Sequence, residues 1–153
     1  MNTQTLKLMA CAAVAVIGGS IAAADVLSVS PMQLEQERVE READRALLDS
    51  TMRSEGRDGV WAKQVENRIR ASLDSVRGLD YSTRNVECAT TLCRVILDHA
   101  TVSGQQQVLN ETAGKPGFDL PGRAHLEWSD DGTAVTYIYL LRFDTDWPEV
   151  LTP

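Results

Sequence analysis

VECATTLCRV, residues 86–95, is the stretch that decides the fold, because β-forming residues flank two cysteines that are separated by four residues. Pairing Cys88 with Cys93 across a turn places Val86 directly opposite Val95. The two valines and the two cysteines then share one face of a hairpin, and that face can be buried. We therefore expect an antiparallel hairpin whose strands are joined by a disulfide.

The same register gives the hairpin a second, polar face, where Glu87 lies opposite Arg94 as a cross-strand ion pair. Leu97 extends the apolar face along the second strand. This alternation is typical of an antiparallel sheet with one face against the core. Closing so short a loop by a disulfide is expected to stabilise the fold by about 2 kcal/mol.

Two other roles for the cysteine pair are weighed against a structural disulfide. A metal site needs further Cys or His ligands, but His99 and His125 are each isolated in the sequence. A redox centre more usually has two residues between its cysteines and stands at a helix start. The structural disulfide is the first interpretation, a redox-labile or regulatory bond the second, and a metal site the third.

A second hairpin is predicted in AHLEWSDDGTAVTYIYLLRF, residues 124–143. The dipeptide Asp131-Gly132 is a strong signal for a two-residue turn, and such a turn sets Trp128 opposite Val135. The strand after the turn is apolar on both faces, so we expect it to lie centrally in the sheet.

Two helices are expected to cover one face of this sheet. The first runs from an N-cap at Asp58 to Gly78. Its apolar residues recur at helical steps of four and three: Trp61, Val65, Ile69, Leu73 and Val76. The second helix is predicted to begin at an N-cap Ser103 and to end near Gly114. Its expected core residues are Val108, Leu109 and Ala113.

A long polar helix is predicted before this domain. Ser30, Pro31 and Gln33 form a capping-box pattern that opens it, and it should continue to about Glu55. Its apolar residues are few: Leu34, Val39, Ala43, Ala46, Leu47 and Met52. Its acid–base pairs four residues apart are Glu37–Arg41 and Asp49–Arg53. We expect a spacer or docking helix that lies lightly on the domain or meets a partner helix.

Residues 1–24 differ in composition from the rest of the chain. Lys7 precedes 17 uncharged apolar or small residues, from Leu8 to Ala24. This pattern predicts a secretory signal peptide cut near Ala24, and therefore a periplasmic or secreted protein in an oxidising compartment. An uncleaved anchor is the main alternative, since 17 residues is the lower limit of a bilayer span. Lipidation at Cys11 is a third.

The net charge of the chain limits the classes of partner that it can bind. The net charge is −7, and removal of residues 1–24 changes it to −8, because Lys7 is their one charged residue. An acidic balance argues against nucleic acid and against anionic lipid. Membrane contact is then expected only through the N-terminal segment, if that segment is uncleaved. A basic protein partner is compatible with the charge.

The strongest candidates for chemistry are His125 and Glu127, which lie two residues apart on one strand face. His99 or Asp98 from the first hairpin could join them in a metal or acid/base site. The simpler interpretation, which we favour, is the solvated outer face of a sheet. The sequence contains no phosphate-binding loop and no serine-nucleophile motif, so no cofactor and no catalytic residue is predicted.

Four residues are the candidate contacts for a partner. Trp147 lies in an acidic, proline-containing tail where nothing in the sequence suggests burial, and the apolar residues Leu34, Val39 and Leu47 lie on the polar helix. Four other aromatic residues are interpreted as core because of their helical or strand spacing. They are Trp61, Trp128, Tyr137 and Tyr139.

The sequence therefore predicts an α+β fold. We expect a four-stranded, mostly antiparallel sheet of two hairpins, with two helices on one face and a long polar N-terminal helix before it. The expected segments are a signal peptide or anchor (1–24), a linker and N-terminal helix (25–57), the α+β domain (58–144) and an acidic tail (145–153).

Three functional hypotheses follow. The leading one is an exported, non-enzymatic binding or adaptor module of a bacterial-type cell envelope, whose partner is another envelope protein. The second is an acidic inhibitor or immunity-type protein that blocks a basic hydrolase, since the net charge suits such a target. The third is an enzyme or metal binder that uses the face of His125 and Glu127.

Overall fold

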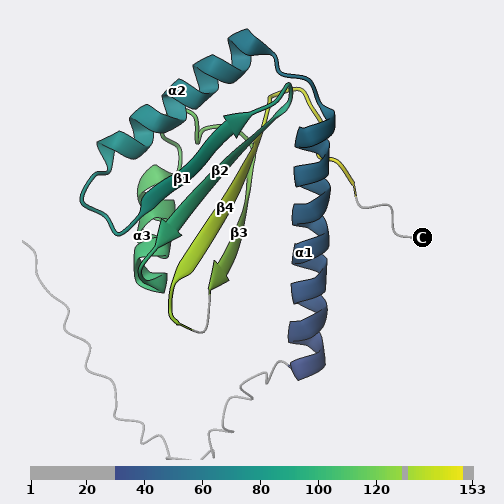
Figure 1. The fold of residues 1–153 in the computed structure, drawn as a ribbon, viewed down its shortest axis with the longest axis vertical. Helices are drawn as coiled ribbons and strands as arrows, with labels where there is room; N and C mark the ends of the chain where they lie inside the picture. The colour runs from purple at the N-terminus through teal and green to yellow at the C-terminus, as the bar shows by residue number, and fades with distance from the viewer. Residues whose placement is uncertain (1–29, 129–130, 150–153) are drawn as a thin grey trace, which may run out of the picture.

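The computed structural model describes residues 30–128 and 131–149; the expected signal peptide, part of the linker and residues 150–153 lie outside the described residues. The helices are α1 (Pro31–Ser54), α2 (Gly59–Ser75) and α3 (Val102–Thr112). The strands are β1 (Ser82–Cys88), β2 (Leu92–His99), β3 (Gly122–Trp128) and β4 (Ala134–Leu141). They form one antiparallel sheet in the order β1-β2-β4-β3, so the α+β prediction and the central place of β4 are confirmed (Figure 1). Within the described ranges, no helix is long and apolar enough to cross a membrane.

The first hairpin has the predicted register. Val86 pairs with Val95, Glu87 with Arg94, and Cys88 with Cys93. The two cysteine sulfurs lie 1.98 Å apart, which is a disulfide distance, and both side chains are buried. The disulfide therefore closes the turn on the apolar face of the hairpin.

The second hairpin differs from the prediction by one residue. Trp128 pairs with Ala134 instead of Val135, because the connection occupies residues 129–133 and Asp131-Gly132 is not a two-residue turn by itself. The Asp131 carboxylate accepts hydrogen bonds from the N–H and the hydroxyl of Thr133. A one-residue shift exchanges the faces of a strand. Trp128 then lies on the same face as Ala134 and Ile138, but at the end of β3 it is 63% exposed, so its assignment to the core is wrong.

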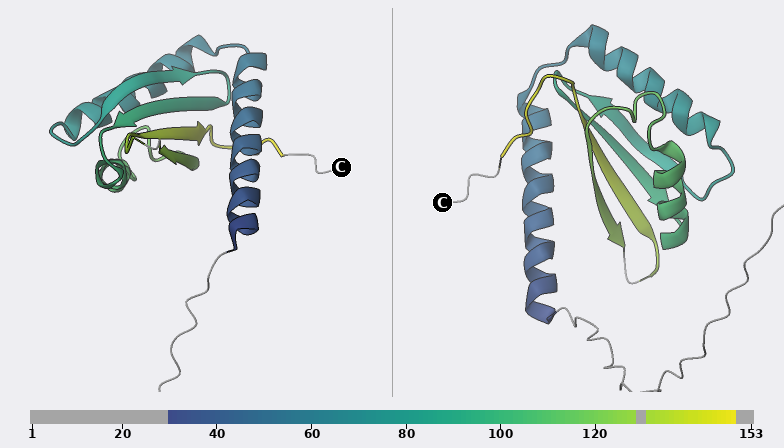
Figure 2. Two further views of the ribbon diagram at one scale, coloured as in Figure 1. Left: turned by 60° about the horizontal axis from the view of Figure 1, so that its bottom comes forward. Right: turned by 180° about the vertical axis from the view of Figure 1, so that it is seen from behind.

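One face of the sheet is covered by α2 and α3, as predicted (Figure 2). The buried core on this face is Ala62, Val65, Ile69, Leu73, Val86, Cys88, Cys93, Val95, Leu97, Val108, Leu120, Ile138 and Leu140. Asp58 is the N-cap of α2, and Trp61 packs at the margin of the core. The cap of α3 is Thr101, two residues before the predicted Ser103, and Ala113 is exposed.

The other face is partly covered by α1. The capping box at its N-terminus is present, and the helix is fixed to the sheet by Leu48 and Met52. The apolar cluster under α1 is Leu48, Met52, Ala89, Leu92, Tyr139 and Leu141. Glu55, just after the helix, accepts hydrogen bonds from the N–H and hydroxyl of Thr91 in the β1–β2 turn. Only the C-terminal part of α1 therefore packs on the sheet, and Leu48 and Met52 are its two buried residues, as expected for a helix that lies lightly on the domain.

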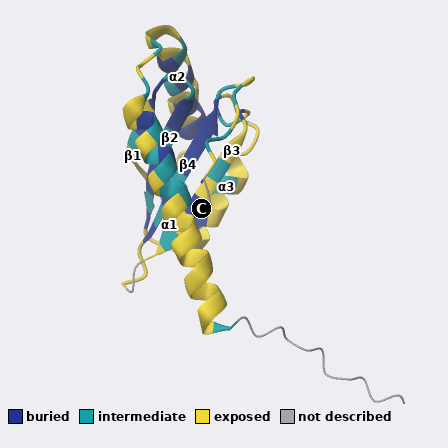
Figure 3. Ribbon diagram, turned by 90° about the vertical axis from the view of Figure 1, so that its right-hand side faces the viewer, coloured by how far each residue is buried: buried dark blue, intermediate teal, exposed yellow. Residues whose placement is uncertain are grey.

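The N-terminal half of α1 continues beyond the sheet and is exposed along its length (Figure 3). Leu34 and Val39, two of the predicted contacts, are exposed there, whereas Leu47 is half-buried nearer the sheet. The arrangement leaves one half of α1 packed and one half free to border a groove.

Candidate functional site

The packed half of α1 is tied to the sheet by charged and hydroxyl groups. The Asp49 carboxylate lies 2.6 Å from Arg94 Nη1 and accepts a 2.8 Å hydrogen bond from the hydroxyl of Tyr139. Burial and this neighbouring carboxylate hold the pKa of Tyr139 far above its ordinary value. Asp49 therefore faces the sheet instead of forming the predicted pair with Arg53, while the predicted Glu37–Arg41 pair is present at 3.6 Å.

His125 lies under α1 and is only 8% exposed, so the prediction of a solvated strand face is wrong for this residue. Its Nε2 is 3.1 Å from Asp44 Oδ2, although the two atoms are not aligned for a hydrogen bond. Arg123 Nη1 donates to the other oxygen of Asp44 at 2.9 Å. Burial lowers the pKa of His125 below its ordinary value, and Asp44 opposes this effect.

Glu127 shares the face of His125, as predicted, and forms an ion pair with Arg45 of α1. The guanidinium of Arg45 also lies 4.7 Å from the ring centroid of Tyr137. The carboxylate of Glu127 is therefore paired with Arg45, a helix residue outside the predicted site.

His99 does not join His125 and Glu127. It is buried on the opposite face of the sheet, where Nδ1 lies 3.0 Å from the carbonyl of Asp80 and Nε2 lies 3.0 Å from the hydroxyl of Thr136. In the part of the chain that the structure describes, no group of three or more His, Cys, Asp or Glu side chains could hold a metal ion. His99 is a hydrogen-bonded core residue.

A groove of about 360 Å³ lies between the N-terminal half of α1 and the end of β3. The helix contributes Arg38, Arg41, Glu42 and Arg45, and the strand contributes residues 125–128. Successive residues of a strand point to opposite faces of its sheet. A groove that four consecutive residues line must therefore run along the edge of β3.

The helix wall of this groove carries three guanidinium groups. Arg38, Arg41 and Arg45 are three and four residues apart, which places them on one side of α1. Each has a carboxylate neighbour, and the Arg41–Glu37 contact is the loosest, with both side chains more than half exposed. A guanidinium has five N–H donors, so these arginines retain donors for a ligand.

The strand wall of the groove is partly apolar. Trp128 and Leu126 are exposed large apolar side chains on consecutive same-face positions of β3. Tryptophan and arginine are enriched at the energetic centres of protein interfaces, and this groove has an exposed indole beside guanidinium groups. Helical spacing of arginines in an otherwise acidic helix is the sequence signal that could have identified this surface.

The predicted contact residue Trp147 is held within the molecule. Its ring lies 4.3 Å from the guanidinium carbon of Arg123, and it packs against the apolar cluster under α1. The expectation that nothing buries Trp147 is therefore wrong. Neither Trp147 nor the predicted contacts Leu34, Val39 and Leu47 belong to the lining of the groove.

Comparisons of the chain with protein-family models, with curated proteins and with solved structures find no match.

Proposed function

We propose that this protein is an exported, non-enzymatic binding module of the cell envelope and that it captures a protein partner in the groove between α1 and β3. The observation that carries the proposal is the composition of this groove, which three arginines of one helix line together with an exposed tryptophan of an edge strand. Tryptophan and arginine are the residues most often found at the energetic centres of interfaces.

The partner is an acidic segment of another envelope protein. The groove concentrates guanidinium groups on a chain whose net charge is −7, so a whole acidic surface or a nucleic acid would be repelled by the remainder of the molecule. A short acidic segment can enter the groove without bringing a large negative charge near the other faces. Its binding should weaken as salt screens the ion pairs.

The acidic balance of the chain favours a second candidate, an inhibitor of a basic hydrolase. In that case the acidic outer surface of the protein would be the contact, and the arginines of the groove would be dispensable. The two candidates therefore differ in the sign of the partner's charge and in the residues on which binding depends.

The test is affinity capture from envelope extract with the full chain and two variants. Arg41→Glu reverses a charge in the groove, and the loose ion pair of Arg41 makes a large loss of stability unexpected. Arg77→Glu is the matched control, because Arg77 is an exposed arginine outside the groove whose partner Asp74 is also exposed.

We expect the wild type and Arg77→Glu to retain the same protein and Arg41→Glu to retain at least tenfold less. Equal retention by all three proteins would contradict the groove as the binding surface. A retained basic enzyme that is indifferent to Arg41 would favour the inhibitor.

A further inference from the structure

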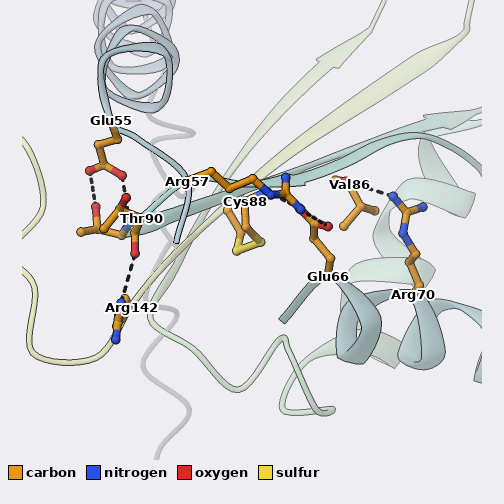
Figure 4. Close-up of a disulfide and its surroundings, with 10 residues drawn as sticks. Glu55, Arg57, Glu66, Arg70, Val86, Cys88, Thr90 and Arg142 are labelled. Carbon is orange, nitrogen blue, oxygen red and sulfur yellow. Dashed lines mark hydrogen bonds and ion pairs between the residues drawn. A yellow bond between two sulfur atoms is a disulfide. The ribbon is translucent and has the colours of Figure 1, made fainter. Parts of the chain in front are cut away.

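The two edges of the sheet differ in whether side chains bind their outward backbone groups. At the β1 edge, the N–H of Cys88 donates to Glu66 Oε1 at 2.9 Å, and Arg70 donates to the carbonyl of Val86 at 3.0 Å. Arg57 holds Glu66 in place from the other side at 2.9 Å (Figure 4). Side chains of α2 thus occupy two outward backbone groups in the C-terminal part of β1, the N–H of Cys88 and the carbonyl of Val86.

At the β3 edge, no side chain among the described residues binds the outward backbone groups. The N–H of Leu141 donates to the carbonyl of Pro121 at 2.7 Å, which fixes the odd-numbered residues of β3 as those that bond to β4. The residues that direct their backbone groups away from the sheet are Gly122, Ala124, Leu126 and Trp128. Among residues 30–128 and 131–149, none forms a hydrogen bond with these outward N–H and C=O groups.

Grooves border this edge along its whole length. The groove of α1 follows residues 125–128, and a second groove of about 270 Å³ follows residues 122–124 on the α3 side. The second groove is largely apolar, with Leu109, Phe118 and Ile138 among its lining residues. A chain that paired with β3 would therefore direct one set of side chains toward apolar residues and the alternate set toward arginines.

We propose that the free edge of β3 binds an extended segment of the partner protein by strand addition. This inference rests on the proposed function, and it specifies the segment as one that alternates apolar and acidic residues. The apolar side chains lie on the α3 side, and the acidic side chains meet Arg38, Arg41 and Arg45. The outward N–H and C=O groups of β3 supply the main-chain hydrogen bonds.

An extended segment suits this surface better than a helix does. A helix has satisfied its own backbone groups, so it would leave the open row of β3 unpaired. An edge strand with exposed apolar residues and free backbone groups promotes aggregation unless something covers it. Glu66 and Arg70 bind part of the β1 edge, whereas no side chain among the described residues binds the outward backbone groups of β3.

The test uses synthetic peptides and the full chain. The probe is a blocked peptide of alternating valine and glutamate. One control replaces glutamate by lysine, and the other keeps the probe sequence but carries methyl groups on alternate backbone nitrogens. Binding is measured by calorimetry, and hydrogen exchange is measured at the amides of Ala124, Leu126 and Trp128.

The expected result is binding of the valine–glutamate peptide with at least tenfold slower exchange at these three outward amides. The lysine peptide and the methylated peptide should each bind at least tenfold more weakly. Equal binding of the methylated peptide, or unchanged exchange at the three amides, would overturn strand addition.

A protein variant provides a second readout. Leu126→Pro removes an outward N–H and none of the bonds to β4, and Leu126→Thr is its control because it keeps that N–H. The proline variant should lose at least tenfold in affinity for the valine–glutamate peptide, and the threonine variant much less.

The outcomes also separate this inference from the proposed function. Capture that depends on Arg41, combined with no peptide protection at the three amides, overturns strand addition and leaves the binding module intact. The same three amides could instead be protected without peptide, with a protection that is lost on dilution. That result would identify a second copy of this chain as the occupant of the edge and would overturn the proposal that a partner segment binds there.

Discussion

The two faces of the sheet hold their helices by different physical means. The face under α2 and α3 is a continuous apolar core with a disulfide, whereas the face under α1 combines a small apolar cluster with ion pairs that involve Asp44 and Asp49. Apolar burial is insensitive to pH and strengthened by many salts, while ion pairs respond to both. The first face is therefore expected to determine whether the domain folds, and the second to determine how firmly α1 and the groove are positioned.

The largest expected effect comes from a cavity in the core of the first face. Ile69→Ala should lower the free energy of unfolding by about 2–5 kcal/mol, because Ile69 is fully buried. Val60→Ala on the same helix is the matched control, since Val60 is 71% exposed, and it should change the value by less than about 0.5 kcal/mol. Denaturant unfolding measures both, and similar effects would contradict the location of the core.

On the second face, Asp49→Ala should lower the free energy of unfolding by about 2–3 kcal/mol. The substitution leaves the buried hydroxyl of Tyr139 without its carboxylate and Arg94 with Glu87 alone, at 3.3 Å. Asp74→Ala removes an exposed ion pair with Arg77 and should cost about 0.5 kcal/mol or less. If the two variants were equally stable, the ion pairs under α1 would not position the helix.

Reduction of the disulfide should have a slightly smaller effect than the cavity. The loop closed by Cys88 and Cys93 is short, so we expect reduction to lower the free energy of unfolding by about 2 kcal/mol. Thermal unfolding with and without reductant measures the difference, and Cys88→Ala combined with Cys93→Ala should make the protein insensitive to reductant. A larger loss in the wild type would indicate that the bond does more than close its turn.

The smallest expected effect is a pH dependence on the second face. Burial lowers the pKa of His125 below 6.5, so the unfolded chain binds a proton more readily than the folded one. Stability should therefore decline as the pH falls from 6.5 toward the lower folded pKa, and it should be unaffected by this group above pH 6.5. Unfolding measured between about pH 7.5 and 5.5 should show a weaker decline in His125→Gln. An identical decline in the variant would assign the effect to other groups.

The first hairpin could be predicted in register because its constraints agree. Cys88 and Cys93 must face one another, and the same pairing matches Val86 with Val95. The second hairpin had only a turn signal to define it. Asp131-Gly132 lies within a longer connection, so the observed register is shifted by one residue from the predicted one. The strand spacing predicted Trp128 in the core, whereas it is exposed at the groove.

The boundaries of α1 were predictable, but its packed side was not. The capping box is local, so Ser30 and Gln33 identify the start of the helix. The side that meets the sheet includes Asp44 and Asp49, whose partners come from strands far away in the sequence. A search for apolar periodicity therefore selected Leu47 and missed its buried neighbour Leu48.

The groove and the open edge of β3 could not be predicted for a related reason. Whether an outward backbone group is free depends on which side chains reach it, and Glu66 reaches Cys88 from 22 residues away. The predicted central place of β4 makes β3 an edge strand, but it does not show whether side chains cover that edge. The predicted contacts Leu34, Val39 and Trp147 were chosen from composition alone and lie outside the groove lining.

The capped edge at β1 has a consequence for how many molecules can join. A sheet with two open edges could grow in both directions, because each added strand would present a new edge to the next chain. Here Glu66 and Arg70 bind the N–H of Cys88 and the carbonyl of Val86, so a strand cannot pair along the C-terminal part of β1 without displacing them. Under the proposed strand addition, pairing along the whole length of an edge is available at β3 and not at β1, so one bound segment per chain is the expected stoichiometry.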